Sequence, residues 1–262
     1  QVMAWISDEY AKIYGHTPAV VTGKPLALGG SLGRDEATGR GLVTVLEAWA
    51  RTEGRSPAGL TAAIQGFGNV GSHAAVALVE AGARVIAVTD RSGGSFDEAG
   101  LDPGALAEHV AETGSVADFT GTRPLSNAEL LALDCDILVP AALGGCVTAD
   151  NVGAVSARIV VEGANAPLTP AAHDVLVDRG VVVLPDILAN AGGVIVSYFE
   201  WAQNLQRVSW TLTEVRDRAA ARLEQATGEV VDRARDRQVD LRRAAYQLAV
   251  DRLREAVFAA GP

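Results

Sequence analysis

Three glycines and one acid give this chain its clearest chemical pattern. Gly66, Gly68 and Gly71 have the spacing G-x-G-x-x-G, and Asp90 follows 19 residues after Gly71. Glycines at this spacing let the backbone turn tightly and approach a pyrophosphate, whose charge is stabilised at the N-terminus of the helix that follows. An acid at this distance can accept a hydrogen bond from a ribose hydroxyl. The pattern therefore predicts a dinucleotide-binding site.

The elements around the glycines decide whether the pattern has this meaning. A glycine triplet in isolation is as compatible with a structural turn, and it indicates a nucleotide only between a buried strand and a helix. Residues 61–65 are short and apolar, as expected of a buried strand, and residues 69–81 show a helical pattern. A second apolar strand is predicted at 84–89, directly before Asp90. The strand–helix–strand context favours nucleotide binding.

Strands and helices alternate along the rest of the chain. Further buried strands are predicted at 136–140, 158–161 and 181–184, helices at 2–14, 35–51, 103–113, 126–132, 170–178, 192–206, 211–236 and 239–259, and turns at 29–34, 91–100 and 143–145. This alternation requires right-handed crossovers and a mostly parallel sheet with helices on both faces. We predict a Rossmann-like, doubly wound α/β fold. Its charged helical C-terminal tail is expected either to cover the sheet or to dock on a neighbouring domain, and we favour docking.

Polar side chains follow two of the predicted strands. Asn165 comes after strand 158–161 and Asn190 after strand 181–184, while Ala141 and Ala142 follow strand 136–140. The carboxyl ends of parallel strands meet at one edge of a sheet, where ligands bind. An asparagine amide both donates and accepts, which suits a nicotinamide carboxamide or the amine and carboxylate of a substrate. One such asparagine commonly forms only an Asx-turn, but two beside the glycine loop predict a pocket.

Composition excludes several classes of partner. The chain has 262 residues, a net charge of −10 and no long basic stretch, which argues against a nucleic-acid partner. It has no run of 18 uncharged apolar residues, so no membrane span is predicted. Cys135 and Cys146 are too few for a disulfide framework and lack metal-site spacing. We expect two buried thiols in a reducing, cytoplasmic environment, and no metal.

Five segments in order resemble glutamate dehydrogenases. They are VTGKPLALGGSLGRDEATGRG at 21–41, QGFGNVG at 65–71, VPAALGG at 139–145, EGANAPLTP at 162–170 and PDILANAGGVIVSYFEWAQN at 185–204. Leucine, phenylalanine and valine dehydrogenases share the glycine loop and the asparagines, but they do not usually have SYFEWAQN. The resemblance covers roughly residues 1–210. Because this chain has SYFEWAQN, the resemblance is to glutamate dehydrogenase in particular.

The resemblance implies an activity and a set of site residues. The activity is the reversible oxidative deamination of L-glutamate to 2-oxoglutarate and ammonia with a nicotinamide cofactor, in a homo-oligomer that is a hexamer at full length. The residues implied near substrate are Arg34, Asn190 and Ser197. Those implied near the cofactor are Thr38, Gly66, Phe67, Gly68, Asn69, Val70, Gly71, Asp90, Arg91, Ala141, Ala142, Asn165 and Asn190.

One group that the family's chemistry needs is missing. The reaction requires an amine of lowered pKa to polarise a carbonyl, with a carboxylate to shuttle protons. The chain has only two lysines, Lys12 in a predicted amphipathic helix and Lys24 in a turn, and neither lies in the family's catalytic-lysine segment. Because the chain also opens with Gln rather than Met, we expect a preceding domain with the catalytic Lys and Asp, and no turnover by this chain alone.

The expected organisation follows from that absence. Residues 1–20 are expected to be a lead-in from the preceding domain, 21–196 the cofactor domain and 197–262 C-terminal helices. NAD is favoured because Asp90 would repel a 2′-phosphate, although the adjacent Arg91 could pair with that phosphate and so permit NADP. Two alternatives stay open, namely another amino-acid dehydrogenase and a nucleotide-binding module without chemistry.

Overall fold

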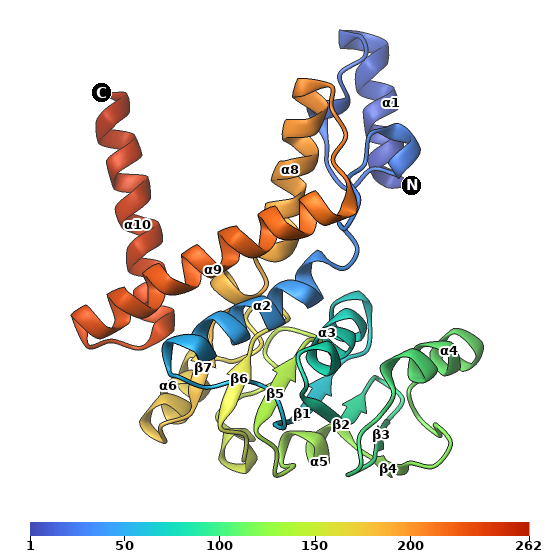
Figure 1. The fold of residues 1–262 in the computed structure, drawn as a ribbon, viewed down its shortest axis with the longest axis vertical. Helices are drawn as coiled ribbons and strands as arrows, with labels where there is room; N and C mark the ends of the chain where they lie inside the picture. Colours follow the sequence, from blue (N-terminus) through green and yellow to red (C-terminus); the bar gives the residue numbers. More distant parts are fainter. Residues whose placement is uncertain (262) are drawn as a thin grey trace.

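The architecture is a seven-stranded sheet covered by helices on both faces (Figure 1). The computed structural model describes residues 1–261. The sheet has the order β4-β3-β2-β1-β5-β6-β7. Its strands are β1 Thr61–Gln65, β2 Arg84–Thr89, β3 Gly94–Phe96, β4 Arg123–Leu125, β5 Ile137–Pro140, β6 Ile159–Val161 and β7 Val182–Leu184. The pairs among β2, β1, β5, β6 and β7 are parallel, whereas β3 and β4 are added antiparallel at one edge.

The helices agree closely with the predicted pattern. They are α1 Val2–Tyr14, α2 Ala37–Thr52, α3 Asn69–Glu80, α4 Pro103–Thr113, α5 Asn127–Leu131, α6 Pro170–Asp178, α7 Asp186–Ala189, α8 Gly192–Gln206, α9 Leu212–Arg237 and α10 Leu241–Ala260, with short 3-10 turns η1 Pro18–Val20, η2 Leu26–Leu28 and η3 Val152–Ala154. Every predicted strand and helix is present within a few residues. The fold prediction of a doubly wound α/β domain is confirmed.

Alternate residues of the central strands β1, β5 and β6 enter different cores. In β5, for example, Ile137 and Val139 belong to the core beneath α2, α3 and α9, whereas Leu138 belongs to the core beneath α5 and α6. The strands β1 and β6 divide in the same way. Side chains of a strand alternate between the two faces of a sheet, so continuous apolar runs are needed where both faces are buried. This is why short apolar segments predicted the strands.

The sequence pattern did not predict the two antiparallel edge strands, β3 and β4. Residues 91–100 were predicted to be a turn, but they contain β3, and β4 was not predicted at all. Each strand has three residues, and β3 includes Gly94 while β4 includes Pro124, so neither shows the usual strand composition. Proline is accepted here because β4 is the last strand of the sheet and has an unpaired edge.

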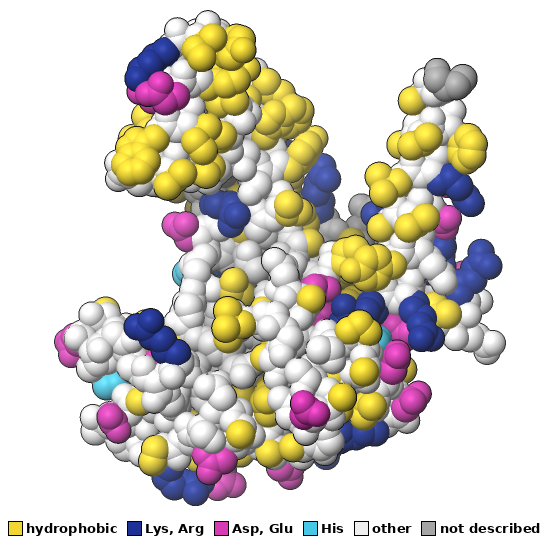
Figure 2. Space-filling view, turned by 180° about the vertical axis from the view of Figure 1, so that it is seen from behind, with side chains coloured by type: hydrophobic (Ala, Val, Ile, Leu, Met, Phe, Trp, Pro, Cys, Tyr) yellow, Lys and Arg dark blue, Asp and Glu magenta, His cyan; other side chains and the backbone are white. Residues whose placement is uncertain are grey.

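The C-terminal tail divides into two parts. Helix α9 packs along α2, and the beginning of α10 contributes the buried Ala244 and Ala245 to the core. The rest of α10 projects upward from the body, as α1 and the far end of α8 do at the other end of α9 (Figure 1). Figure 2 shows hydrophobic side chains gathered on both projections, and they include the exposed Trp5 and Ile13 of α1 and Leu253 and Phe258 of α10.

Candidate functional site

A pocket lies beyond the carboxyl ends of the parallel strands, between the strand tips and helices α2, α7 and α8. Its volume is about 730 Å³. Eight residues predicted from the sequence line it together, namely Arg34, Thr38, Val70, Ala141, Ala142, Asn165, Asn190 and Ser197. The residues come from five separate segments of the chain, and the topology of a parallel sheet is what brings them to one edge.

The glycine loop adjoins this pocket. Gly66 has a φ of 96°, and a Cβ there would lie 2.9 Å from the Cα of Ala142. A Cβ on Gly71 would lie 1.8 Å from the carbonyl oxygen of Gly66, so α3 can begin this close to β1 only with glycine. Gly68 differs from both, because a Cβ there would have no heavy atom within 4 Å. Two of the glycines thus shape the loop, and the third leaves its outer face open.

The start of α3 fits an anionic ligand. Gly68 is the N-cap and no side chain caps the helix, so the first backbone N–H groups of α3 point out of the helix without a side-chain acceptor. The Phe67 side chain is buried in the core, so this residue can present only its backbone. Asn69 uses its side chain to donate to the carbonyl oxygen of Asp35 at 2.7 Å, which ties the loop to the segment before α2.

Asp90 follows β2 next to the glycine loop, but its carboxylate already holds the backbone. Oδ1 accepts from the amide of Ser92 at 2.6 Å and Oδ2 from the amide of Val116 at 2.8 Å. Burial by itself would raise the pKa of Asp90, but these amide hydrogen bonds outweigh it and lower the pKa below its ordinary value. The side chain of Arg91 is exposed beside it. Neither Asp90 nor Arg91 lines the strand-tip pocket.

Arg34 and Ser197 form the polar end of the pocket. Arg34 Nε donates to Ser197 Oγ at 2.9 Å, and this hydroxyl donates to the carbonyl oxygen of Gly193 at 3.0 Å, one helical turn earlier. The remaining guanidinium N–H groups of Arg34 can receive a carboxylate. A Cβ on Gly193 would lie 2.5 Å from Thr38 Oγ1, so glycine is required for α8 to approach α2 here.

Asn165 and Asn190 contact each other across the pocket wall. Asn190 Nδ2 donates to Asn165 Oδ1 at 2.8 Å, and it lies 3.4 Å from the carbonyl oxygen of Gly163. The pair therefore leaves the amide group of Asn165 and the oxygen of Asn190 as donor and acceptor for a ligand.

Sequence reasoning missed several lining residues. They are Leu143, Gly144, Gly163, Ala164, Ile187, Ala191, Gly193 and Val194. All lie inside the segments that resemble glutamate dehydrogenases, but they line the pocket with backbone and apolar surface, which a pattern of polar side chains does not reveal. Closeness in sequence to Ala142, Asn165 and Asn190 was the signal that could have found them.

Neither lysine lines the pocket. Lys12 is exposed on α1 and pairs with Glu9 at 2.6 Å. Lys24 is fully buried, and its Nζ contacts Glu200 Oε1 and the carbonyl oxygen of Val21, each at 2.6 Å. Lys12 is thus a solvated side chain, and Lys24 belongs to a buried ion pair.

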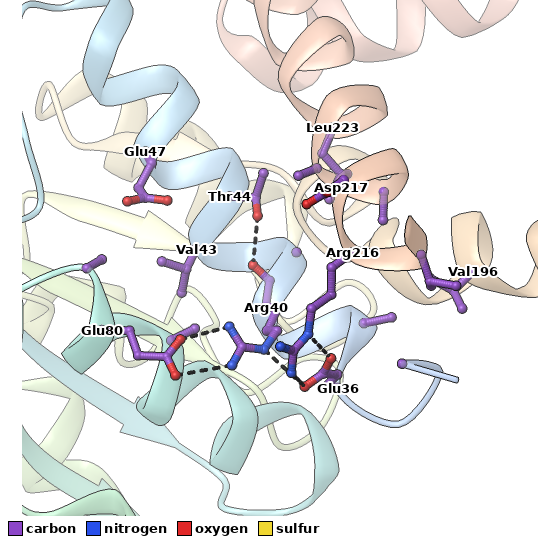
Figure 3. Close-up of a pocket in the computed structure, with 18 residues that line it drawn as sticks. Glu36, Arg40, Val43, Thr44, Glu47, Glu80, Val196, Arg216, Asp217 and Leu223 are labelled. Carbon is purple, nitrogen blue, oxygen red and sulfur yellow. Dashed lines mark hydrogen bonds and ion pairs between the residues drawn. The ribbon is translucent and has the colours of Figure 1, made fainter. Parts of the chain in front are cut away.

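A second hollow lies on the outer side of α2 and is bounded by α3 and α9 (Figure 3). Its volume is about 290 Å³. Glu36 accepts from Arg216 at 2.6 Å and from Arg40 at 3.0 Å, and Arg40 also contacts Glu80 at 2.8 Å. These side chains satisfy one another, so the hollow is best explained as a clamp that joins three helices.

The clamp should depend on pH. The hydrogen bond from Arg216 lowers the pKa of Glu36, burial opposes that shift, and Arg40 adds to it. A carboxyl whose folded pKa is depressed stabilises the protein above its ordinary value of 4.5 and loses that effect as pH falls through the folded pKa. We expect Glu36→Gln to lower the free energy of unfolding by about 1 kcal/mol at neutral pH.

Denaturant unfolding between pH 7 and pH 3 measures this effect. The difference between wild type and the Glu36→Gln variant should shrink below the ordinary carboxyl pKa. Glu47→Gln is the matched control, because Glu47 lines the same hollow but forms none of the ion pairs just described. A stability difference that stays constant with pH, or an equal effect of Glu47→Gln, would contradict a stabilising role for the ionised Glu36 carboxylate.

The cysteines are shielded thiols. Burial raises the pKa of Cys135 to about 12 and that of Cys146 to about 11, so both are protonated at neutral pH. Cys135 is buried and Cys146 is half-buried. Within residues 1–261, no group of three or more His, Cys, Asp or Glu side chains could hold a metal ion. In the same range, no helix is long and apolar enough to cross a membrane.

Known proteins match the chain over nearly its whole length. The sequence model of the Glutamate/Leucine/Phenylalanine/Valine dehydrogenase family matches residues 29–261. A glutamate dehydrogenase of Thermotoga maritima is 47% identical over 254 residues, which are 96% of this chain and 61% of that protein. The chain thus spans about three fifths of the length of this relative.

Solved structures agree with the sequence match. The hetero-hexameric glutamate dehydrogenase of Thermus thermophilus, in its Leu-bound form, superposes with a TM-score of 0.94 at 40% identity. The match covers 100% of this chain and 62% of the Thermus chain. The glutamate dehydrogenase of Peptoniphilus asaccharolyticus superposes with a TM-score of 0.86 at 34% identity, with the same coverage of 100% and 62%. The chain therefore belongs to the Glutamate/Leucine/Phenylalanine/Valine dehydrogenase family.

Proposed function

We propose that this chain is the dinucleotide-binding part of an NAD(P)-dependent glutamate dehydrogenase. The observation that supports the proposal most directly is that the glycine loop at the start of α3 and the strand-tip pocket adjoin each other at one edge of the sheet. The open face of Gly68 at the uncapped start of α3 leads, through Val70, into the pocket that contains Arg34, Asn165 and Asn190. An elongated ligand with a pyrophosphate at its middle and an amide at one end matches that arrangement.

The proposed roles follow from position and chemistry. The backbone of residues 66–71 receives the pyrophosphate, with the first N–H groups of α3 as donors. Thr38, Asn165 and Asn190 complement the carboxamide of the nicotinamide ring, which accepts or delivers hydride when bound. Ala141 and Ala142 form the wall beside Gly66, where no large side chain can fit.

Glutamate is proposed as the substrate because the pocket ends in a cation and a hydroxyl. Arg34 and Ser197 are joined at 2.9 Å and can receive a distal carboxylate, for which a guanidinium is a good partner. An amino-acid dehydrogenase for leucine, phenylalanine or valine is the alternative. It would need an apolar end to the pocket, and the Arg34–Ser197 pair argues against it.

Substrate chemistry would require groups that the described pocket does not contain. The side chains lining it between residues 34 and 197 include no lysine and no carboxylate, so proton transfer to the amino acid has no donor or acceptor here. We propose that these groups come from a further domain, so that the chain alone binds nucleotide without turnover. Residues 1–20 and the projecting part of α10 would pack against that domain. A non-catalytic nucleotide module would explain the loop but not the Arg34–Ser197 pair.

NAD is the proposed cofactor, with NADP as the alternative. A carboxylate at Asp90 accepts from a ribose 2′-hydroxyl and repels a 2′-phosphate, although the two backbone contacts limit how far this side chain can turn. The exposed Arg91 is the group that would favour NADP. For the whole protein we propose a homo-oligomer, in keeping with the hexamer implied by the family resemblance.

Titration calorimetry of this chain with NAD and with NADP tests the proposal. We expect measurable binding at about millimolar concentration or below, with NAD preferred. Adding L-glutamate to the NAD complex should produce no absorbance from reduced cofactor. Absence of binding by both nucleotides would refute the proposed function, and tighter binding of NADP would reverse the cofactor assignment alone.

A further inference from the structure

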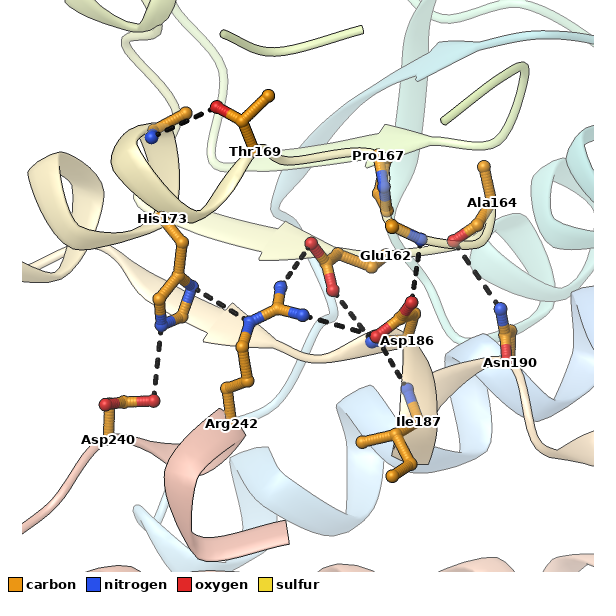
Figure 4. A network of polar contacts seen from close by, with 12 residues as sticks. Glu162, Ala164, Pro167, Thr169, His173, Asp186, Ile187, Asn190, Asp240 and Arg242 are labelled. Carbon is orange, nitrogen blue, oxygen red and sulfur yellow. Dashed lines mark hydrogen bonds and ion pairs between the residues drawn. The ribbon is translucent and has the colours of Figure 1, made fainter. Parts of the chain in front are cut away.

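A buried polar cluster joins the start of α10 to the ends of β6 and β7 (Figure 4). At its centre, Arg242 Nη2 contacts Glu162 Oε1 at 2.5 Å and Nη1 contacts Asp186 Oδ1 at 3.3 Å. Glu162 is fully buried, and Arg242 is the cation that faces it. Arg242 Nε also donates to His173 Nδ1 at 3.3 Å. One guanidinium thus contacts three side chains, one directly after β6, one in α6 and one in α7.

The two carboxylates in turn hold the backbone that follows β6 and β7. Glu162 Oε2 accepts from the amide of Asp186 at 2.8 Å, and Asp186 Oδ2 accepts from the amide of Ala166 at 2.7 Å. Ala166 has a φ of 46°, in the left-handed region that non-glycine residues rarely adopt. A turn of this kind persists only when its surroundings enforce it. Asp186 supplies that support directly, and Arg242 supplies it through Asp186.

The same turn contains the pocket residues. Asn165 immediately precedes Ala166, and it receives the hydrogen bond from Asn190, which follows α7. Asp186 begins α7, so this one carboxylate touches the turn on one side and starts the helix on the other. The geometry of the Asn165–Asn190 pair therefore depends on the cluster, although none of the cluster's side chains lines the pocket.

The start of α10 keeps Arg242 in place. Asp240 caps this helix by accepting from the amide of Arg243 at 3.0 Å, and His173 Nε2 donates to Asp240 at 3.2 Å. Burial lowers the pKa of His173, and the positive charge of Arg242 lowers it further, so the imidazole is neutral at pH 7 and can accept at Nδ1 while donating at Nε2. Burial raises the pKa of Glu162 and Arg242 opposes that shift, which makes Arg242 the counter-charge for this carboxyl.

We propose that Arg242 is a positioning residue for the nicotinamide end of the dinucleotide pocket, and that it acts through Glu162 and Asp186 on the Asn165–Asn190 pair. The inference rests on the proposed nucleotide-binding function. It links the start of α10, the last helix of the chain, to the part of the pocket where hydride transfer would occur.

The test compares a whole ligand with a partial one. NADH contains the nicotinamide ring, whereas ADP-ribose has only the adenine, ribose and pyrophosphate parts that reach the glycine loop. For Arg242→Met we expect NADH to bind about five- to tenfold more weakly, the loss of roughly one hydrogen bond, while ADP-ribose binding changes by less than about twofold. If wild type prefers NADPH, NADPH and 2′-phospho-ADP-ribose are the matched pair.

Two further variants separate positioning from general damage. Arg242→Lys retains a charge but cannot bridge both carboxylates, so we expect it to show the same split to a smaller degree, and it serves if the methionine variant fails to fold. Arg254→Met removes another arginine of α10, whose side chain is 61% exposed and pairs with Asp251 rather than with any member of the cluster, and it should leave the binding of both ligands unaffected. Amide hydrogen exchange should also be faster at Ala166 and Asp186 in the Arg242 variants than in wild type.

The outcomes separate the two proposals. Wild type that binds neither ligand overturns the proposed function and the inference with it. Wild type that binds both, together with Arg242 variants that weaken both equally or neither, overturns only the positioning role. Unchanged exchange at Ala166 and Asp186 in those variants would contradict it independently of any ligand.

Discussion

Lys24→Met is expected to destabilise the protein by about 3–5 kcal/mol, the cost of leaving one partner of a buried ion pair alone. The side chains of Lys24 and Glu200 are both fully buried, and the distance between Nζ and Oε1 is 2.6 Å. Glu200 Oε2 also accepts from the amide of Gly23 at 2.8 Å. Without the ammonium, this carboxylate would be buried with no counter-charge. Denaturant unfolding at pH 7 measures the loss.

The chain provides its own control for this substitution. Lys12 is the only other lysine of the sequence, and it forms an exposed pair with Glu9. Lys12→Met should therefore change the free energy of unfolding by less than about 1 kcal/mol. A double variant, Lys24→Met with Glu200→Leu, removes both charges and should recover much of the lost stability. Equal effects at the two lysines, or a double variant no better than Lys24→Met alone, would contradict a buried pair.

The contrast between the lysines illustrates what sequence could not reveal. Lys24 and Glu200 are 176 residues apart, and no local pattern connects a turn before α2 with the middle of α8. The same holds for Arg242 and Glu162, which are 80 residues apart. Neither pair could be predicted from sequence, because each partner is unremarkable in its own segment. The Lys24–Glu200 pair depends on the packing of α8 against the segment around η1, and the Arg242–Glu162 pair on the packing of α10 against α7 and β7.

Features set by local physics were predictable. The central strands were found because burial on both faces demands an uninterrupted apolar run, and the glycine loop because its backbone geometry admits no side chain at Gly66 or Gly71. The pocket residues were predicted because strand ends converge in a parallel sheet. The role of Asp90 illustrates the limit, since the sequence placed an acid after β2 but could not show that backbone amides occupy both oxygens.

Substitution of the glycines in the loop should separate fold from ligand binding. Gly71→Ala places a Cβ where the carbonyl oxygen of Gly66 lies only 1.8 Å away, and the neighbour is backbone rather than a flexible side chain. The turn between β1 and α3 must then open. We expect a loss of about 3 kcal/mol of stability, at the upper end for overpacking, together with loss of dinucleotide binding. Thermal unfolding and calorimetric titration of the same preparation measure both.

Gly68→Val is the matched variant with the opposite profile. Gly68 has a φ of −78° and a ψ of −160°, which a valine can adopt, and no protein atom lies within 4 Å of its Cβ position. Stability should therefore fall by no more than about 1 kcal/mol, because valine is less favourable than glycine at an N-cap but meets no clash here. Binding of the dinucleotide should nevertheless be abolished, because the valine would occupy the space that the pyrophosphate needs beside the first amides of α3. If the Gly68→Val protein bound NAD as well as wild type does, the pyrophosphate could not bind at this loop as proposed. A Gly71→Ala protein of unchanged stability would show that the loop can relax where the packing of α3 on β1 indicates that it cannot.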